Sequence, residues 1–421
     1  MIRFDECKTI DDYAAWLTVG FGSPRAKFIR DMLYGIHNTR SVRLADIARA
    51  LNEPSELHST RNRLSRNLAS TQLATELSDR LLQQAAYSIK RDTRLIVRVH
   101  ALNKPDAKKM QYLYNETDSA TDSYQVCEIV ASNTGSRKYL PLFSTFWSRH
   151  APDYVSDVDE ISRAIHQVLT VTNGRGIVFL DHPFLELQTL SALVAELAED
   201  ADVQFVARIQ ANDAAQLRYR QKSKTLLELR ELCNTRYACR IFKVLPQDSG
   251  PPQDSSQPQA MRDSSHYQGL YQAIVSSTDG ELTEHSINME FGTLAVRHQA
   301  SLRRLNLLVL KGELSTHLLT SLDGLQTRQS LLEPIWSWFS TWEVISAHST
   351  IADSFTPDGI GVMTYERMRL LLTLLHAVIF FESRSYRLKD HSLTRLQPHE
   401  GRKFQRDFLL PEDVARMGSQ E

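Results

Sequence analysis

The feature that most constrains this chain is the alternation of strand and helix patterns between Arg94 and about Gln210. Short apolar runs rich in β-branched residues are followed there by stretches whose apolar residues recur at helical spacing. One helical pattern covers residues 156–171, with Ser156 as its expected cap, and a second covers residues 185–200. This order predicts an α/β sheet domain. The expected strands are LIVRVHAL, YQVCEIVAS, YLPLFST, GIVFLD and VQFVARIQ.

The segment before this domain has a helical and basic pattern. Helices are expected over residues 23–36, 40–51 and 58–70. Ser23 would cap the first helix with Pro24 in its first turn, and Ser59 or Thr60 would cap the third. Between Pro24 and Ser70, nine Lys or Arg residues outnumber four Asp or Glu residues. Two interpretations remain open, a helix-turn-helix unit that binds DNA and a helical bundle with a solvated basic face.

The pattern from about Leu226 to Ser321 is that of a β-rich region. Its expected strands are ACRIFKVL, LYQAIVSS, INMEFGTLAVRH and LRRLNLLVL. The segment PQDSGPPQDSSQPQAMRDSS separates the first two, and its polar composition predicts a mobile surface loop. Helical patterns return over residues 326–351 and 363–384, so the β-rich region is expected to be an insertion into the α/β domain.

The composition argues against several classes of protein. A net charge of -1 over 421 residues gives no general attraction to nucleic acid or membrane, so any charged binding surface has to be local. Four cysteines without a C-x-x-C pair argue against a disulfide framework and a structural zinc site. The start MIRFDECKTIDDY is too acidic for a signal peptide, and the apolar run Leu370–Phe381 is too short to cross a bilayer. We expect a reducing, cytoplasmic location and no membrane partner.

Three segments, RVHALNKPDAKKM, FLDHPFL and WFSTWEVI, lie in the first expected strand, at the end of the fourth and in the C-terminal helical region. With the order of elements, they resemble the catalytic segments of the cut-and-paste DDE transposases of bacterial insertion sequences. The first is similar to vDlsDiaKpyakkm, which places Arg98 at the family's first acid. The second is similar to vlDRGFD and keeps the second acid as Asp181. The third is similar to YxxRWxIE and places Ile345 at the family's glutamate.

The resemblance implies an RNase H-like mixed sheet with an N-terminal helical DNA-binding domain and an inserted β-rich subdomain. The implied units are 1–88 (DNA-binding), 89–210 (RNase H-like, first part), 211–325 (β-rich insertion), 326–388 (RNase H-like, C-terminal helices) and 389–421 (tail). It also implies a homodimer on paired DNA ends and a nucleoid-associated location in a bacterium.

The residues at the family's acid positions bear on activity. The family's reaction needs two divalent metal ions held by carboxylates. Because Arg98 and Ile345 replace two of the three acids, we expect no metal, no other cofactor and no DNA cleavage. The expected function is transposase-like DNA binding. Two alternatives remain, an active transposase that uses Mg²⁺ at an unusual site and a scaffold subunit that binds a protein partner. The expected DNA contacts are Arg40, Arg43, Arg61, Arg63, Arg66, Lys104, Lys108 and Lys109.

Arg98 lies inside an apolar strand and needs a counter-charge if it is buried. Arg98 and His100 share one face of the strand, which is expected to be the face that bears Asp181. The sequence therefore predicts an Arg98–Asp181 ion pair, with exposure at the sheet edge as the alternative. Glu343 neighbours the third acid position, but it lies two residues before Ile345, which turns it about 200° away on a helix. The nearby tryptophans are expected in the core, with base stacking as the alternative: Trp336, Trp338 and Trp342.

Overall fold

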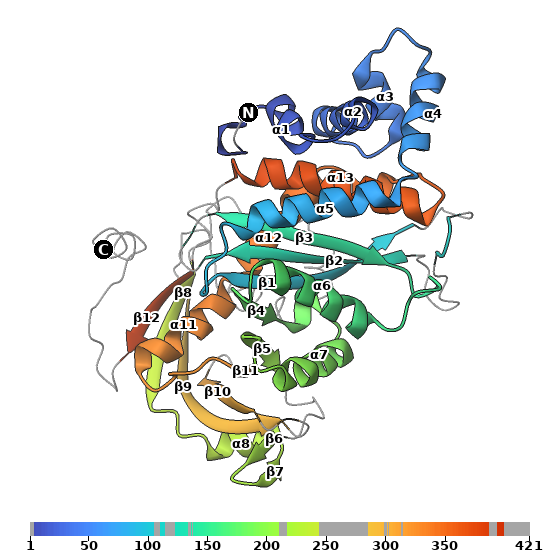
Figure 1. The fold of residues 1–421 in the computed structure, drawn as a ribbon. Helices are drawn as coiled ribbons and strands as arrows, with labels where there is room; N and C mark the ends of the chain where they lie inside the picture. Colours follow the sequence, from blue (N-terminus) through green and yellow to red (C-terminus); the bar gives the residue numbers. More distant parts are fainter. Residues whose placement is uncertain are drawn as a thin grey trace.

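The computed structural model describes residues 4–104, 110–113, 123–133, 136, 138–209, 217–243, 285–298, 301, 303–312, 315–386 and 394–399. These residues form one twelve-stranded mixed sheet with helices on both of its faces (Figure 1). The N-terminal helices lie at one end of the molecule, and a short β-hairpin lies at the opposite end.

The five strands expected between Arg94 and Gln210 are confirmed and lie next to one another in the sheet. They are β1 (Arg94–Asn103), β2 (Ser123–Ser132), β3 (Tyr139–Trp147), β4 (Ile177–Leu180) and β5 (Phe205–Ile209). The first three form an antiparallel meander, whereas β4 is parallel to β1 and β5 is parallel to β4. Helix α6 (Asp157–Val171) connects β3 to β4, and α7 (Leu187–Glu199) connects β4 to β5. Ser156 caps α6 as predicted, because its side chain accepts a hydrogen bond from the backbone N–H of Asp159.

The β-rich region continues the same sheet. Its strands are β6 (Leu217–Tyr219), β7 (Lys222–Lys224), β8 (Tyr237–Lys243), β9 (His285–His298), β10 (Arg304–Gly312), β11 (Thr316–Thr320) and β12 (Thr394–His399). Strand β11 pairs with β5, and β10, β9, β8 and β12 follow in that order. The β6–β7 hairpin pairs with β9 and leads into helix α8 (Leu226–Leu232). The expected strands ACRIFKVL, INMEFGTLAVRH and LRRLNLLVL are confirmed, whereas LYQAIVSS and the Pro/Ser/Gln segment lie outside the described residues.

The N-terminal region is helical, as predicted. After a 3-10 turn, η1 (Phe4–Glu6), it forms α1 (Ile10–Leu17), α2 (Ser23–Thr39), α3 (Leu44–Leu51), α4 (Leu57–Asn67) and α5 (Thr71–Ala86). The predicted caps of two helices are wrong, because Gly22 precedes α2 and Glu56 precedes α4. The hydroxyl of Thr60 is occupied elsewhere: it is buried and donates a hydrogen bond to Glu53 over 3.0 Å.

The C-terminal helical patterns form three helices and one 3-10 turn. They are α11 (Arg328–Phe339), α12 (Thr341–Asp353), η3 (Pro357–Gly359) and α13 (Tyr365–Ser383). Helices α11 and α12 meet at Ser340, and α12 packs against β1, β2 and β3. Helix α13 packs against β3, α5 and α2, so it joins the N-terminal helices to the sheet. No helix in the described part of the chain is long and apolar enough to span a membrane.

The contact between α2 and α3 depends on a glycine. A Cβ added to Gly35 would lie 2.4 Å from Cγ2 of Ile47, which is fully buried, and 3.3 Å from its Cα. Gly35→Ala would gain roughly 1 kcal/mol of helix propensity. We expect the overlap to outweigh this gain and to lower the free energy of unfolding by about 1–3 kcal/mol. Denaturant unfolding of Gly35→Ala against Gly361→Ala measures this, since an added Cβ at Gly361 meets nothing within 4 Å. Equal midpoints for the two variants would contradict the prediction.

Candidate functional site

The face of β1 beneath α11 and α12 carries two arginines. Arg94 and Arg98 are four residues apart in the strand, so both side chains lie on the same face. Their exposed fractions are 2% and 5%, and a third arginine, Arg208 on β5, is 2% exposed. Guanidinium groups buried to this degree require hydrogen-bonded counter-charges. The partners of these arginines therefore determine what this face can do.

Arg98 pairs with a carboxylate of the neighbouring strand. The antiparallel register places Glu128 of β2 directly opposite Arg98, and Nη1 of Arg98 lies 3.3 Å from Oε2 of Glu128. His348 of α12 contacts the other carboxylate oxygen through Nε2 over 2.9 Å, and Nδ1 of His100 lies 3.6 Å from Oε2. The expected Arg98–Asp181 pair is therefore wrong, because a direct cross-strand neighbour already supplies the counter-charge.

Asp181 has a different set of partners. It lies at the end of β4, is buried, and accepts a hydrogen bond from Nε of Arg208 over 2.5 Å. Its other oxygen accepts a hydrogen bond from Nε1 of Trp338 on α11 over 2.7 Å. The guanidinium carbon of Arg208 also lies 5.7 Å from the centre of the Trp338 ring. Trp338 is thus a core residue, as expected, and its 3% exposure leaves no surface for a nucleic-acid base.

Arg94 is held at the junction of α11 and α12. It donates hydrogen bonds to the backbone oxygen of Ser337 and to the hydroxyl of Ser132, both over 3.0 Å, and it also contacts Ser340. Burial lowers the pKa of Arg94 to about 10, although the carboxylate of Glu343 acts in the opposite direction. Glu343 is also buried. Ile345, which the sequence resemblance places at the third acid of the transposases, is a buried apolar residue.

The site as a whole has no excess negative charge. We call it the buried charge cluster: Arg94, Arg98, Arg208, Glu128, Asp181 and Glu343. Its three guanidinium groups balance its three carboxylates. Burial acts to raise the pKa of Glu128, but His348, His100 and Arg98 together hold it well below its usual range. Burial also lowers the pKa of His100 to about 3.

The carboxylates of the buried charge cluster are therefore poor ligands for a metal ion. A divalent cation at Asp181 or Glu128 would meet an arginine that already occupies the carboxylate oxygens. Among the described residues, no group of three or more His, Cys, Asp or Glu side chains is arranged to hold a metal ion. The buried charge cluster therefore has a structural role: it attaches α11 and α12 to the sheet.

The predicted DNA contacts on α4 fall into two groups. Arg61 and Arg66 are exposed, and Arg61 lies 3.3 Å from the ring of His58 on the same helix. Arg63 instead forms ion pairs with Asp31 of α2 over 2.9 Å and with Glu53 over 3.0 Å. Arg63 therefore holds α4 against α2, while Arg61 and Arg66 remain available on the surface.

Two further predicted contacts lie between the N-terminal helices and the C-terminal helices. Arg40 forms an ion pair with Glu382 of α13 over 3.0 Å, and its guanidinium carbon lies 4.7 Å from the centre of the Phe355 ring. The side chain of Arg43 packs over Gly359 of η3, since a Cβ added there would lie 3.1 Å from its Nε. Both arginines thus contribute to the docking of the helical region on the rest of the molecule.

The prediction that Lys104 contacts DNA is wrong. It is 3% exposed, and its Nζ donates hydrogen bonds to the carbonyls of Pro357, Asp358 and Ile360 over 3.2, 2.7 and 3.2 Å. Burial lowers the pKa of Lys104 to about 8. The lysine ties the end of β1 to η3 and cannot reach a phosphate. Lys108 and Lys109 lie outside the described residues.

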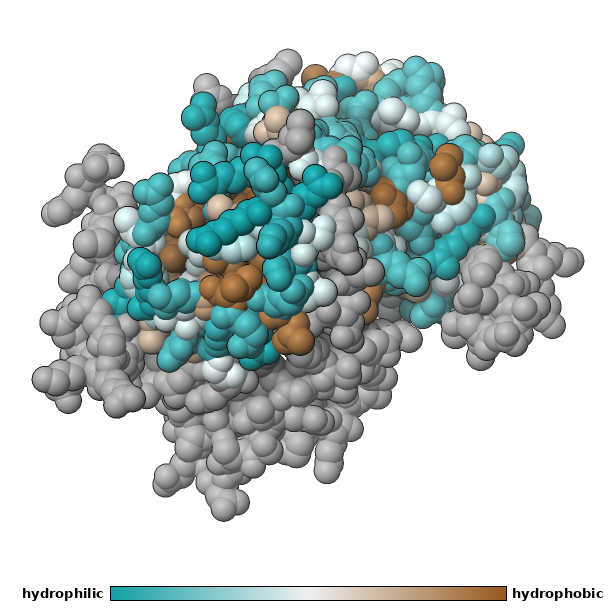
Figure 2. Space-filling view, turned by 90° about the horizontal axis from the view of Figure 1, so that it is seen from below, coloured by the Kyte–Doolittle hydropathy of each residue, from teal (hydrophilic) through white to brown (hydrophobic). Residues whose placement is uncertain are grey.

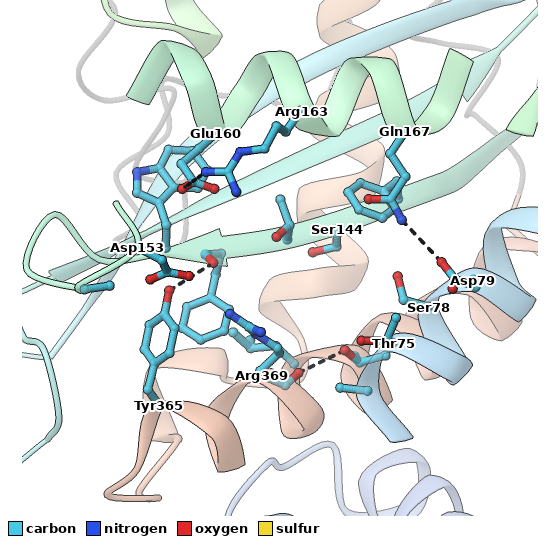
Figure 3. A pocket seen from close by; sticks show the side chains of 18 of the residues that line it. Thr75, Ser78, Asp79, Ser144, Asp153, Glu160, Arg163, Gln167, Tyr365 and Arg369 are labelled. Carbon is cyan, nitrogen blue, oxygen red and sulfur yellow. Dashed lines mark hydrogen bonds and ion pairs between the residues drawn. The ribbon is translucent and has the colours of Figure 1, made fainter. Parts of the chain in front are cut away.

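A cavity of about 240 Å³ lies over β3, between α6 on one side and α5 and α13 on the other (Figure 3). Gln167 donates a hydrogen bond to Asp79 over 3.3 Å and so links α6 to α5. The hydroxyl of Tyr365 lies 3.4 Å from the backbone oxygen of Phe146. None of the predicted site residues lines this cavity.

Comparisons with known proteins give a structural likeness but no likeness in sequence. No known protein-family model matches the sequence, and no curated protein matches it either. The fold is similar to a piggyBac transposase, solved by cryo-EM in a synaptic complex with hairpin DNA, with a TM-score of 0.40 and 9% sequence identity. The alignment covers 93% of this chain and 71% of the transposase chain.

Removal of the Glu128 charge tests the role of the cluster. Glu128→Gln leaves the buried guanidinium of Arg98 without its counter-charge, so we expect the free energy of unfolding to fall by about 3–5 kcal/mol. Glu186→Gln is the matched control, because Glu186 is 75% exposed and its ion pair with Arg149 spans 3.6 Å. The control should change stability by less than about 1 kcal/mol. Similar chemical-denaturation curves for the two variants would show that the charge of Glu128 is not required.

Proposed function

We propose that this protein binds DNA on a transposase-like, RNase H-like fold and does not cut it. The observation that carries the proposal is the pairing of Asp181 with Arg208 and of Glu128 with Arg98, each within a buried ion pair. Cleavage by two-metal chemistry needs carboxylates that are free to bind the ions. Here Asp181 accepts hydrogen bonds from Arg208 and Trp338, and Arg98 stands at the position of the first acid.

The sheet order supports the RNase H-like assignment. Strands β3, β2, β1, β4 and β5 lie in this order, with an antiparallel meander followed by two parallel strands. The β-rich region enters between β5 and α11, where the resemblance implies an insertion. Asp181 at the end of β4 and Arg98 on β1 are on neighbouring strands, as the family's first two acids would be.

Helix α4 is the proposed DNA-contacting element. The sequence LHSTRNRLSRN of α4 contains three arginines and no acid. His58 is three residues from Arg61 and four from Asn62, and Asn62 is four residues from Arg66, so these exposed side chains lie on one broad side of the helix. Arginine, asparagine and histidine side chains at such spacing can contact both phosphates and base edges. The ion pairs of Arg63 with Asp31 and Glu53 fix the orientation of α4, so that this side of the helix points to the solvent.

The first prediction of this proposal concerns cleavage. Purified protein incubated with supercoiled plasmid and Mg²⁺ or Mn²⁺ should leave the plasmid supercoiled, because the cluster has no free metal-binding carboxylate. Gel electrophoresis of the wild type and Asp181→Ala should give the same result. Nicking by the wild type that disappears in Asp181→Ala would identify an active transposase and overturn this part of the proposal.

The second prediction concerns binding. The double variant Arg61→Gln/Arg66→Gln removes two phosphate contacts, so we expect the slope of log affinity against log salt to fall by about two. Fluorescence anisotropy with labelled duplex DNA over a salt series measures this slope. The matched control Arg91→Gln/Arg163→Gln removes two exposed charges elsewhere and should keep the wild-type slope. If both double variants behave alike, α4 does not contact DNA.

A further inference from the structure

Three exposed arginines lie side by side on neighbouring strands at the far end of the sheet. Arg218 of β6 is directly opposite Arg297 of β9, and Arg297 is directly opposite Arg304 of β10. Residues paired in this way lie on the same face of a sheet, about 4.5–5.5 Å apart. All three side chains are exposed. We call this row the basic ladder: Arg218, Arg297 and Arg304.

The described residues do not neutralise the basic ladder. Within the described part of the chain, no Asp or Glu lies within ion-pair distance of any of its arginines. The adjacent Arg303 faces elsewhere, because it donates hydrogen bonds to the carbonyls of Leu197 and Asp200. Like charges directly opposite one another destabilise a sheet. The row therefore has a cost to folding that nothing in the described structure offsets.

The hairpin next to the ladder adds to its charge. Strands β6 and β7 are joined by Arg220 and Gln221, both with positive φ, of 48° and 66°. Arg220 and Lys222 are exposed at this turn. In Figure 2, which views the molecule from the side where the hairpin lies in Figure 1, most of the visible coloured surface is hydrophilic. Arg220 and Lys222 therefore add two exposed cations next to the basic ladder.

We propose that the basic ladder is a second DNA-contacting surface that binds the phosphodiester backbone. This inference rests on the proposed function. Guanidinium groups form paired hydrogen bonds to phosphate oxygens, and three of them on adjacent strands span about 10 Å. Phosphates of one DNA strand recur every 3.4 Å along the helix axis, so the row covers about three nucleotides. Because α4 and the hairpin lie at opposite ends of the molecule in Figure 1, the two surfaces contact separate stretches of DNA.

The test compares three variants with the wild type on a 60-base-pair duplex, by anisotropy over a salt series. The ladder variant Arg218→Gln/Arg297→Gln/Arg304→Gln should lower the salt slope by about three and weaken binding at least about tenfold. The matched control Lys90→Gln/Arg91→Gln/Arg163→Gln removes three exposed charges elsewhere and should bind like the wild type. The third variant, Arg61→Gln/Arg66→Gln in α4, tests the first DNA-contacting surface in the same assay.

The outcomes separate this inference from the proposed function. If the wild type does not bind DNA, the proposed function fails and the ladder inference fails with it. If the α4 variant loses affinity while the ladder variant matches its control, only the ladder inference is overturned. Loss of affinity in the ladder variant beyond that of its control supports it.

Stability without DNA gives an independent readout. Arg297 is the middle member, so Arg297→Gln relieves two like-charge contacts at once. Its melting temperature should equal or exceed that of the wild type, while its DNA affinity falls. A lower melting temperature would show that the guanidinium stabilises the fold, and this would overturn the inference.

Discussion

The burial of three guanidinium groups beneath α11 and α12 is the constraint on which the sheet depends. A buried guanidinium needs partners for its N–H groups. Glu128 pairs with Arg98 and Asp181 with Arg208, whereas Arg94 donates hydrogen bonds to Ser132 and Ser337. These contacts join β1 to β2 and to the junction of α11 and α12, and they join β5 to the end of β4. His348 and Trp338 complete the hydrogen bonds of two of the carboxylates. The centre of the fold is therefore held together by charge as well as by apolar packing.

Local patterns were sufficient to predict the strands and helices around this cluster but not its pairings. The alternation of apolar and polar residues predicted β1 to β5, because the burial of one or both faces of a strand produces a pattern in consecutive residues. The Arg98–Glu128 pair depends on the register of β1 and β2, which are separated by a long connection, and no local pattern specifies it. One signal was present: Glu128 and Arg208 each lie inside an otherwise apolar strand, as Arg98 does. Charged residues of opposite sign in several apolar strands of one sheet point to mutual pairing.

For the arginines of the N-terminal region, too, the local sequence does not specify which residues they contact. Arg40, Arg61 and Arg63 have the same chemistry and lie within one basic stretch, yet they have different roles. Arg63 faces Asp31 of α2 and Arg40 faces Glu382 of α13, so both stabilise contacts between helices. Arg61 lies on the open side of α4. Which arginine is free depends on the acids that tertiary packing brings close, and those acids are up to 342 residues away in the chain.

The helices around β3 have a consequence for the behaviour of the protein at high concentration. Strand β3 is the last strand of the sheet on its side, and an edge strand of nine residues would ordinarily offer its unpaired backbone groups to another chain. Here α6 stands on one side of the strand and α5 and α13 on the other, and the Gln167–Asp79 hydrogen bond joins the two sides (Figure 3). A strand from a second molecule would have to separate these helices before it could pair. The walls of the cavity thus hinder the pairing of another strand with the β3 edge of the sheet.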